Sequence, residues 1–334
     1  MAASYLEASL NQLGPSLTRE NLIELCINPD GRLWAEFQGD HFMRPLDERV
    51  SPVQARDLAH RIASEAKTTI SEERPIISCS IRHRDRPIRA QVVQPPAAAG
   101  IVISLRFFST LPLDEIELKY LYGKARSLEQ QRRERNLELR AVVADGDVYE
   151  AIRFCVQHKL NMIVAGGTST GKTVAARKIM SFIPPEERIV TIEEAAELLP
   201  VQPNSVTLLA DREIAARSAD ALLTATLRLR PDRIVLGEVR GREALTFLEA
   251  INTGHGGSLT TLHAETPQLA VQRLAIAALK TDVPMTYADM IAYIEASIDV
   301  IIQAGRHDGG RGIAEFYLPG EKEAAKGATR LTAA

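Results

Sequence analysis

The sequence predicts an α/β protein in which an N-terminal α+β domain is followed by a domain built on a mainly parallel sheet. Three observations support this prediction. Strand candidates and one helix fill the first part of the chain, a glycine-rich loop joins a strand to a helix near its middle, and apolar strands then alternate with helices. We place the N-terminal domain at residues 1–112, a linker at 113–145, the second domain at 146–319 and a flexible tail at 320–334.

The composition excludes several classes of protein. Of the 334 residues, 45% are hydrophobic and 25% are charged, and the net charge of −3 gives no basic field for nucleic acid. Cys26, Cys79 and Cys155 lie far apart, which excludes a CxxC-type zinc site and fits a reducing compartment. No apolar run approaches the roughly 20 residues that span a bilayer, and no signal sequence is found, so we expect a cytoplasmic protein.

The N-terminal domain is predicted to combine strands with one long helix. Residues 1–19 carry leucines at helical spacing and could form a weak helix or an arm that docks to a neighbour, but a frayed terminus is expected. The strand candidates lie at residues 21–27, 32–37, 75–81, 87–93 and 101–107. The turn sequence at 28–31, Asn-Pro-Asp-Gly, joins the first two strands into a hairpin. Ser51 and Pro52 supply the start of a helix, and strand alternation puts Arg106 on the face opposite the apolar residues.

The linker is predicted to be a polar helix. Basic residues outnumber acidic residues between 124 and 140, and a charge run of this kind is usually a solvated helix face. The alternative is that one of its arginines reaches a nucleotide across a domain or subunit boundary. Asp147 then caps a helix at 148–158 that leads into the second domain.

The glycine-rich loop lies between an apolar strand at 161–165 and a helix at 174–182, which is the context of a phosphate-binding loop. Glycines let the backbone point its N–H groups at a phosphate, while Lys172 would contact the β- and γ-phosphates and Thr173 would offer its hydroxyl to Mg²⁺. The predicted nucleotide-binding residues are Gly166, Gly167, Thr168, Ser169, Thr170, Gly171, Lys172, Thr173 and Val174. The alternative is a merely structural glycine-rich turn, which the flanking strand and helix disfavour.

Beyond the loop, strands and helices alternate as a parallel α/β core requires. Strands are predicted at 188–192, 233–237 and 258–262, helices at 218–229, at 243–253 and from 267, and a hairpin around Asp308-Gly309. The strands deliver polar residues at their carboxyl ends, where open parallel sheets bind their ligands.

These strand ends supply the groups that phosphoryl transfer needs. Glu238 follows an apolar strand and is the candidate carboxylate for activating water; an isolated glutamate there could also form a salt bridge or a cap. Glu193 and Glu194 form a second acidic pair, suited to Mg²⁺ or water, although either could cap a helix. His263 could sense the γ-phosphate or bond Glu238, or be structural. Four arginines crowd this region, and at least one should neutralise phosphate charge: Arg228, Arg230, Arg233 and Arg240.

The order of these motifs resembles the secretion-ATPase superfamily, the hexameric traffic ATPases of type II and type IV secretion and type IV pili. The motifs are the phosphate loop at 166–173, an acidic box at 191–194, a second acidic motif at 227–241 and a histidine box at 253–264. Residues 28–34, Asn-Pro-Asp-Gly-Arg-Leu-Trp, resemble more narrowly the conjugal-transfer ATPases of the TrbB type.

The resemblance implies that the second domain is a RecA-like P-loop ATPase domain that uses ATP and Mg²⁺. The candidate catalytic residues are Glu238, Glu193, Glu194, His263, Arg240 and Arg106, and the candidate metal contacts are Thr173 and Glu238. The family also implies a nucleotide between the two halves of each subunit and a six-membered ring. Arginines from the N-terminal side reach the γ-phosphate in such proteins, and Arg106 is the candidate here.

Three departures from the family pattern bear on these expectations. Ser169-Thr170 stands where the family usually has Gly-Ser, which should be tolerated if the backbone at Ser169 is unstrained. Glu194-Ala195 replaces the usual Asp-Thr of the acidic box. The four-cysteine zinc element typical of type II assembly ATPases is missing, which favours the type IV, conjugation-like branch.

The sequence therefore predicts an ATPase that converts domain closure around its nucleotide into force on a secretion or conjugation channel. It would be a homo-oligomer that approaches the cytoplasmic face of the inner membrane through the channel's membrane components. ATP is favoured over GTP by the family and by the absence of an Asn-Lys-x-Asp motif. The alternatives are a pilus assembly or retraction motor and a nucleotide-gated interaction module with little turnover. A DNA-binding motor is disfavoured, because no basic stripe with interleaved aromatic residues is present.

Overall fold

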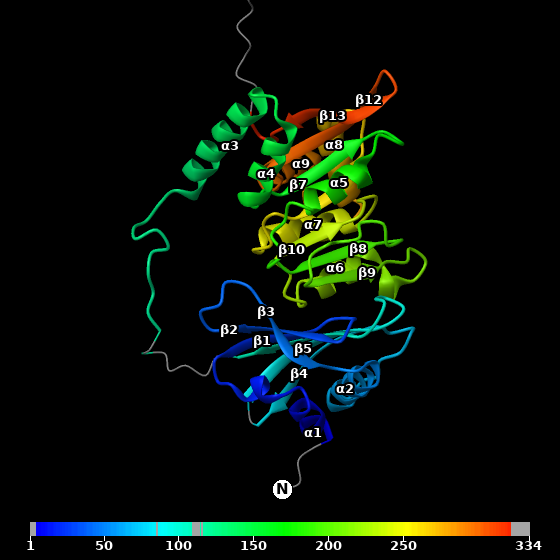
Figure 1. The fold of residues 1–334 in the computed structure, drawn as a ribbon. Helices are drawn as coiled ribbons and strands as arrows, with labels where there is room; N and C mark the ends of the chain where they lie inside the picture. The colour runs from blue at the N-terminus through cyan, green and yellow to red at the C-terminus, as the bar shows by residue number, and fades with distance from the viewer. Residues whose placement is uncertain (1–4, 85, 109–113, 115, 322–334) are drawn as a thin grey trace, which may run out of the picture.

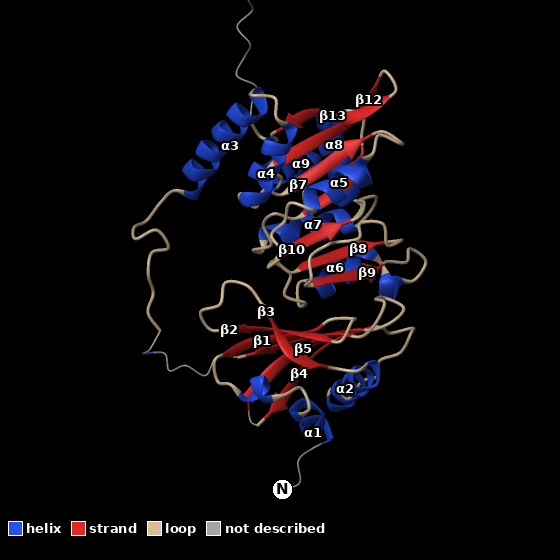
Figure 2. Ribbon diagram, viewed as in Figure 1, coloured by secondary structure: helices blue, strands red, loops and turns tan. Residues whose placement is uncertain are grey.

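The computed structural model describes residues 5–84, 86–108, 114 and 116–321, and it confirms the α/β fold class (Figure 1). The strands form two separate sheets, and helices lie beside both (Figure 2). One sheet is built from the first 107 residues and the other from residues 162–317. The predicted boundary at residue 112 and the tail from residue 322 lie outside the described residues.

The N-terminal sheet has six strands in the order β3-β2-β1-β6-β5-β4, and every neighbouring pair is antiparallel. The elements are α1 (Tyr5–Asn11), η1 (Pro15–Thr18), β1 (Leu22–Ile27), β2 (Arg32–Phe37), β3 (Arg44–Arg49), α2 (Pro52–Glu65), β4 (Ile76–His83), β5 (Arg86–Val93) and β6 (Val102–Phe107). The five predicted strands and the helix are confirmed. The sequence pattern missed β3, an edge strand whose charged residues carry no apolar alternation.

The expectation that residues 1–19 fray is wrong for the part the structure describes. Leu6 and Leu10 of α1, together with Leu13 and Leu17, are buried in the N-terminal core with residues of α2. The helical spacing of these leucines therefore reports a packed face, because burial of large apolar side chains outweighs the weak tendency of so short a helix to form alone.

The second sheet has seven strands in the order β13-β12-β7-β11-β10-β8-β9. All neighbouring pairs are parallel except β12 and β13, which form the predicted hairpin. The strands are β7 (Met162–Gly166), β8 (Ile189–Glu193), β9 (Ser205–Leu209), β10 (Arg233–Leu236), β11 (Leu259–His263), β12 (Val300–His307) and β13 (Gly310–Tyr317). The helices are α3 (Leu128–Ala144), α4 (Val148–Gln157), α5 (Lys172–Met180), η3 (Ala215–Arg217), α6 (Ala219–Thr226), α7 (Glu243–Asn252), α8 (Pro267–Ala278) and α9 (Tyr287–Ser297).

Helices cover both faces of this sheet. Residues of α6, α7, α8 and α9 pack with Ile163 and Ile234 on one face, whereas residues of α3, α4 and α5 pack with Val164 and Val235 on the other. Neighbouring residues of one strand are therefore both buried, which explains why these strands read as continuous apolar runs. The carboxyl ends of β7, β8, β10 and β11 meet at one edge because these strands are parallel.

The predicted linker contains α3, and this helix is attached to the second domain. Arg132 donates to the carbonyl oxygen of Ala296 at 2.8 Å, Arg135 pairs with Asp299 at 2.6 Å, and Leu139 is fully buried. The polar helix is confirmed, and its arginines bond residues next to α9. The exact limits of the linker remain a prediction.

The N-terminal sheet packs against the β9 edge of the second sheet (Figure 1). The N–H of Leu209 donates to the carbonyl of Ala97 at 2.8 Å, and Arg230 pairs with Glu36 of β2 at 2.6 Å. Three strands, β11, β10 and β8, separate this edge from β7. The N-terminal domain is thus held away from the loop that follows β7.

Candidate active site

The phosphate loop connects β7 to α5 and has the backbone that its glycines allow. Gly171 precedes α5 with a φ of 91°, a conformation that favours glycine. A Cβ on Gly166 would lie 2.7 Å from the carbonyl oxygen of Ala304, so a larger residue cannot fit there. Lys172, Thr173 and Val174 form the first turn of α5, which begins two residues before the predicted start at residue 174. The N-terminus of this helix therefore opens at the carboxyl edge of the sheet, where an anion is stabilised by its N–H groups.

Ser169 does not have the unstrained backbone that the sequence prediction required. Its φ is 60°, in the left-handed region that β-carbon-bearing residues adopt only at a cost. We expect Ser169→Gly to raise the free energy of unfolding by about 1 kcal/mol. Urea denaturation followed by circular dichroism measures this change. Thr168→Gly is the matched control, because Thr168 has a negative φ; an equal gain in the control would contradict the strain at Ser169.

A chain of polar contacts joins the loop to the neighbouring strand ends. The ammonium group of Lys172 donates to the carbonyl of Gly167 at 2.9 Å and lies 3.2 Å from Nδ1 of His263. Nε2 of His263 lies 3.5 Å from Oε1 of Glu238, and Oε2 of Glu238 accepts a hydrogen bond from Arg240. The structure therefore brings together four of the predicted residues around one point of the sheet edge.

The protonation of this chain follows from its contacts. An ammonium group can only donate, so Nδ1 of His263 must accept from Lys172 and the ring proton must be on Nε2, facing Glu238. Partial burial and the charge of Lys172 both lower the pKa of His263, in agreement with a neutral ring. Burial alone would raise the pKa of Glu238, but the hydrogen bond and charge of Arg240 outweigh it and the pKa is lowered. Glu238 is therefore ionised at neutral pH.

The acidic pair divides into two different environments. Glu193, the last residue of β8, is buried, and its Oε2 accepts from the N–H groups of Glu197 at 2.9 Å and Leu198 at 2.8 Å. Glu194 is about half exposed, pairs with Arg212 and has Arg240 at 3.9 Å. The contacts of Glu193 hold the following loop, whereas Glu194 joins the contact chain through Arg240.

Of the four arginines in this region, the structure brings Arg240 to the site. Arg228 donates to Ser78 and Arg230 pairs with Glu36, so both bond the N-terminal sheet. Arg233 begins β10, at the end of the strand away from Glu238, and is fully buried. Of the four, Arg240 therefore lies where it could neutralise phosphate charge, and that role stays a prediction.

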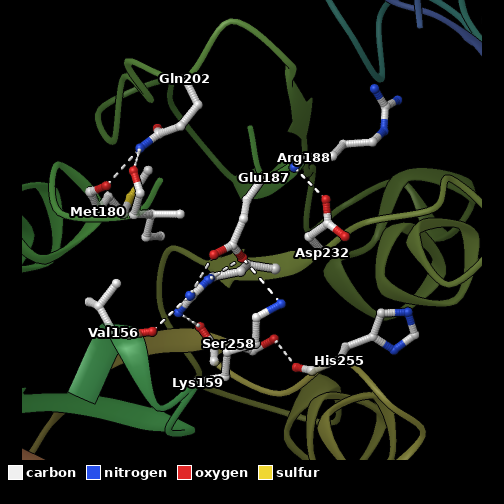
Figure 3. A network of polar contacts seen from close by, with 12 residues as sticks. Val156, Lys159, Met180, Glu187, Arg188, Gln202, Asp232, His255 and Ser258 are labelled. Atoms are coloured by element: carbon white, nitrogen blue, oxygen red, sulfur yellow. Dashed lines mark hydrogen bonds and ion pairs between the residues drawn. The ribbon is translucent and has the colours of Figure 1, made fainter. Parts of the chain in front are cut away.

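The buried Arg233 forms the centre of a structural network. It makes a two-pronged ion pair with Glu187, at 2.7 and 2.8 Å, and also donates to the carbonyl of Val156 at 2.8 Å. Lys159 adds a second cation 3.6 Å from Glu187 (Figure 3). Burial opposes the charged form of Glu187, but Arg233 and Lys159 lower its pKa nevertheless. This network ties α4 to the strands, on the side of the sheet remote from the loop.

Arg106 does not lie at the phosphate loop of its own chain. It stands in β6 opposite Glu24 of β1, and its charge acts on that buried carboxylate. The N-terminal sheet that carries Arg106 lies at the β9 edge, with three strands between that edge and β7 (Figure 1). Among the residues that the structure describes, the N-terminal half and the phosphate loop therefore do not come together as the expected nucleotide site between the two halves requires.

Two residues beside the loop were missed by the sequence interpretation. A Cβ on Gly167 would lie 2.7 Å from Oε1 of Glu265, so a carboxylate borders the loop. The Cδ of Arg311 lies 3.9 Å from the corresponding position on Gly171. Glu265 could have been found from the sequence, because it lies two residues after His263, which was already assigned to a strand end. Nothing in the sequence near Arg311 indicates that it lies beside the loop.

A cavity of about 480 Å³ adjoins Glu238 on the side of α8. Its walls are formed by Glu238, Val239, Arg240, Leu262, His263, Arg273, Ile276, Ala277 and Lys280. Within the described residues no group of three or more histidine, cysteine, aspartate or glutamate side chains is arranged to hold a metal ion.

The second domain has a mainly parallel sheet with a phosphate loop after β7. Glu238 and His263 lie at the ends of adjacent strands beside that loop. This combination defines a P-loop nucleoside triphosphatase. The sequence matches the family described as "Type II/IV secretion system protein" over residues 7–306, and the chain belongs to this family. It is an ATPase, as the sequence predicted.

Individual relatives place the chain near type IV secretion and conjugal transfer. It is 31% identical to the type IV secretion system protein VirB11 of Brucella suis, covering 96% of this chain and 92% of that one. It is 32% identical to PtlH of Bordetella pertussis, covering 90% of each chain. The conjugal transfer protein TrbB of Rhizobium radiobacter is 32% identical, covering 91% of this chain and 86% of that one.

A solved structure agrees with these relatives. The crystal structure of the VirB11 ATPase from the Brucella suis type IV secretion system, in complex with sulphate, has a TM-score of 0.80 and 28% identity. The match covers 94% of this chain and 97% of that chain. The resemblance to secretion ATPases inferred from the motifs is confirmed. No helix among the described residues is both long enough and apolar enough to cross a bilayer.

Proposed function

We propose that this ATPase hydrolyses ATP with Mg²⁺ and powers a type IV secretion or conjugal DNA-transfer apparatus as a hexameric ring motor. The observation that carries the proposal is the contact chain from Lys172 through His263 to Glu238 beside an open phosphate loop. Its relatives VirB11, PtlH and TrbB are proteins of type IV secretion and conjugal transfer, which supports the cellular role. Its place is the cytoplasmic face of the inner membrane, against membrane components of the channel.

Glu238 is the group that accepts a proton from the attacking water. It is ionised at neutral pH and held by Arg240 and His263, so its free lone pairs are directed by fixed partners. The water oxygen bonds the γ-phosphorus, its proton passes to Glu238, and the bond from the γ-phosphorus to the bridging oxygen breaks to release ADP. Lys172 exchanges its contacts with Gly167 and His263 for the β- and γ-phosphate oxygens.

The residues present fit a magnesium ion that is bound together with the nucleotide. Mg²⁺ keeps several waters and takes only one or two protein ligands beside phosphate oxygens, which agrees with the absence of a larger ligand cluster among the described residues. Thr173 in the first turn of α5 and the ionised Glu238 are the proposed contacts. When bound, the ion neutralises charge on the phosphates.

The pH dependence of turnover follows from the two lowered pKa values. We expect kcat/KM for ATP to be flat from about pH 8 down to 6.5, the ordinary value for histidine, and to fall only below it. Protonation of His263 breaks its bond from Lys172, and protonation of Glu238, whose pKa is lowered from 4.5, removes the base. Steady-state rates across this range measure the profile. An acidic limb centred above pH 7 would contradict the neutral His263.

The ring motor is tested by turnover as a function of protein concentration, with sedimentation on the same samples. We expect turnover per subunit to rise as the chain assembles into rings, and to be lost in Lys172→Ala at every concentration. Tight ATP binding by a monomer without turnover would instead indicate a nucleotide-gated interaction module. A full rate in the monomer would exclude assembly as a requirement for catalysis.

A further inference from the structure

The hairpin of β12 and β13 forms one wall of the phosphate loop. β12 pairs in parallel with β7, with Gln303 opposite Ala165, so its next residues run beside the loop. The carbonyl oxygen of Ala304 lies 2.7 Å from the Cβ position of Gly166, and the Cδ of Arg311 lies 3.9 Å from that of Gly171. Apart from the residues next to Gly171 and the backbone of α5, no other heavy atom of the described residues lies within 4 Å of the Cβ position on Gly171. The Cδ of Arg311 therefore lies beside Gly171, the residue that precedes α5.

Two arginines of this hairpin stand directly opposite each other. Arg306 of β12 is the register partner of Arg311 of β13, and both side chains are exposed. Like charges in a directly opposed cross-strand pair are unfavourable. In the described part of the chain no carboxylate lies within 4.0 Å of either guanidinium, and the acidic residue of the turn, Asp308, pairs with His307. The pair therefore offers uncompensated positive charge beside the loop, which an anion would neutralise.

The hairpin lies on the side of the loop away from the reacting groups. In the sheet, β12 and β11 flank β7 on opposite sides. His263 ends β11 and contacts Glu238, and Glu265 borders Gly167, so the phosphate that is cleaved lies on the β11 side. A triphosphate that crosses the N-terminus of α5 with its γ-phosphate there must direct its α-phosphate and ribose toward the β12–β13 side.

We propose that Arg311, with Arg306 beside it, binds the α-phosphate end of the nucleotide. The Cδ of Arg311 lies 3.9 Å from the position that a Cβ on Gly171 would take, and its planar guanidinium can donate two hydrogen bonds to one phosphate. Arg311 touches no reacting atom in this arrangement, so it is a binding residue for the part of the nucleotide that is not transferred. The identity of the ligand as a nucleotide rests on the proposed function.

The test compares Arg311→Gln with the wild type in steady-state ATP hydrolysis and in direct binding of ADP. We expect the KM for ATP and the Kd for ADP to rise about 10- to 100-fold, with kcat changed less than about threefold. Arg311→Lys should restore only part of the affinity, since an ammonium cannot make the two-pronged contact. His307→Gln, at the exposed tip of the same hairpin, is the matched control and should leave all three constants unchanged.

The outcomes separate this inference from the function on which it rests. If the wild type neither binds nor hydrolyses ATP, the proposed function fails. If the wild type is active and Arg311→Gln has the wild-type KM and Kd, only the role of Arg311 is overturned. A variant that loses kcat together with its melting temperature would show that Arg311 supports the fold of the hairpin, which overturns the inference as well.

Discussion

Replacing Glu238 with glutamine is expected to lower the kcat for ATP hydrolysis by about 100- to 10,000-fold while leaving ATP bound. Glutamine keeps the size of the side chain and can still meet Arg240 and His263, but it cannot accept the proton of the attacking water. Single-turnover hydrolysis and equilibrium binding of ATP, measured on the same preparation, separate the chemical step from affinity. The loss should therefore appear in kcat and hardly in Kd.

Two further variants make the assignment specific. Lys172→Ala should lose nucleotide affinity as well as turnover, because it removes the charge that contacts the β- and γ-phosphates. Glu194→Gln should change kcat by less than about tenfold, because Glu194 is half exposed and its carboxylate is bound to Arg212. If Glu238→Gln keeps a rate within about threefold of the wild type, Glu238 is not the base. Glu265, the other carboxylate beside the loop, would then be the residue to replace.

The elements of the second domain could be predicted because local patterns determine them. Helix starts depend on the capping side chains next to them, such as Thr266 before α8 and Ser218 before α6, and buried parallel strands are recognisable as short apolar runs. The strand ends then indicated Glu238 and His263, since parallel strands deliver their carboxyl ends to one edge. The contacts of Glu193 could not be predicted in this way. They depend on how the backbone turns after β8 and brings two N–H groups onto its carboxylate.

The positions of Arg233, Arg311 and Arg106 differ from the sequence prediction because they depend on contacts between residues far apart in the chain. Arg233 looked like a candidate for the site because it lies five residues before Glu238, but the strand between them puts the two side chains at opposite ends of β10. Arg311 lies beside Gly171 only through the pairing of β13 with β12 and of β12 with β7. Arg106 depends on where one domain docks against the other, which no motif in the chain encodes.

The second large effect is expected from the buried pair of Arg233 and Glu187, which is remote from the chemistry. Arg233→Met should lower the free energy of unfolding by about 3–5 kcal/mol. The substitution leaves a carboxylate that is 2% exposed with Lys159 as its remaining cation among the described residues, and it removes one of the hydrogen bonds that the carbonyl of Val156 accepts. Urea denaturation followed by circular dichroism measures the loss. Arg133→Met is the control, because Arg133 forms a surface pair with Glu129 that should contribute less than about 1 kcal/mol.

The pH dependence of this loss tests its electrostatic origin. The pKa of Glu187 is lowered in the folded protein, so the pair contributes its full stability above the ordinary value of 4.5 and loses it as the pH falls through the folded value. In Arg233→Met, burial of Glu187 is opposed by Lys159 but no longer by Arg233, so the carboxyl becomes neutral at a higher pH than in the wild type. The difference in stability between the two proteins should therefore narrow as the pH falls from the pKa of Glu187 in the variant to its lower pKa in the wild type. A difference that stays constant with pH would assign the loss to packing around Gly257, whose missing side chain leaves the room that the Arg233 guanidinium occupies.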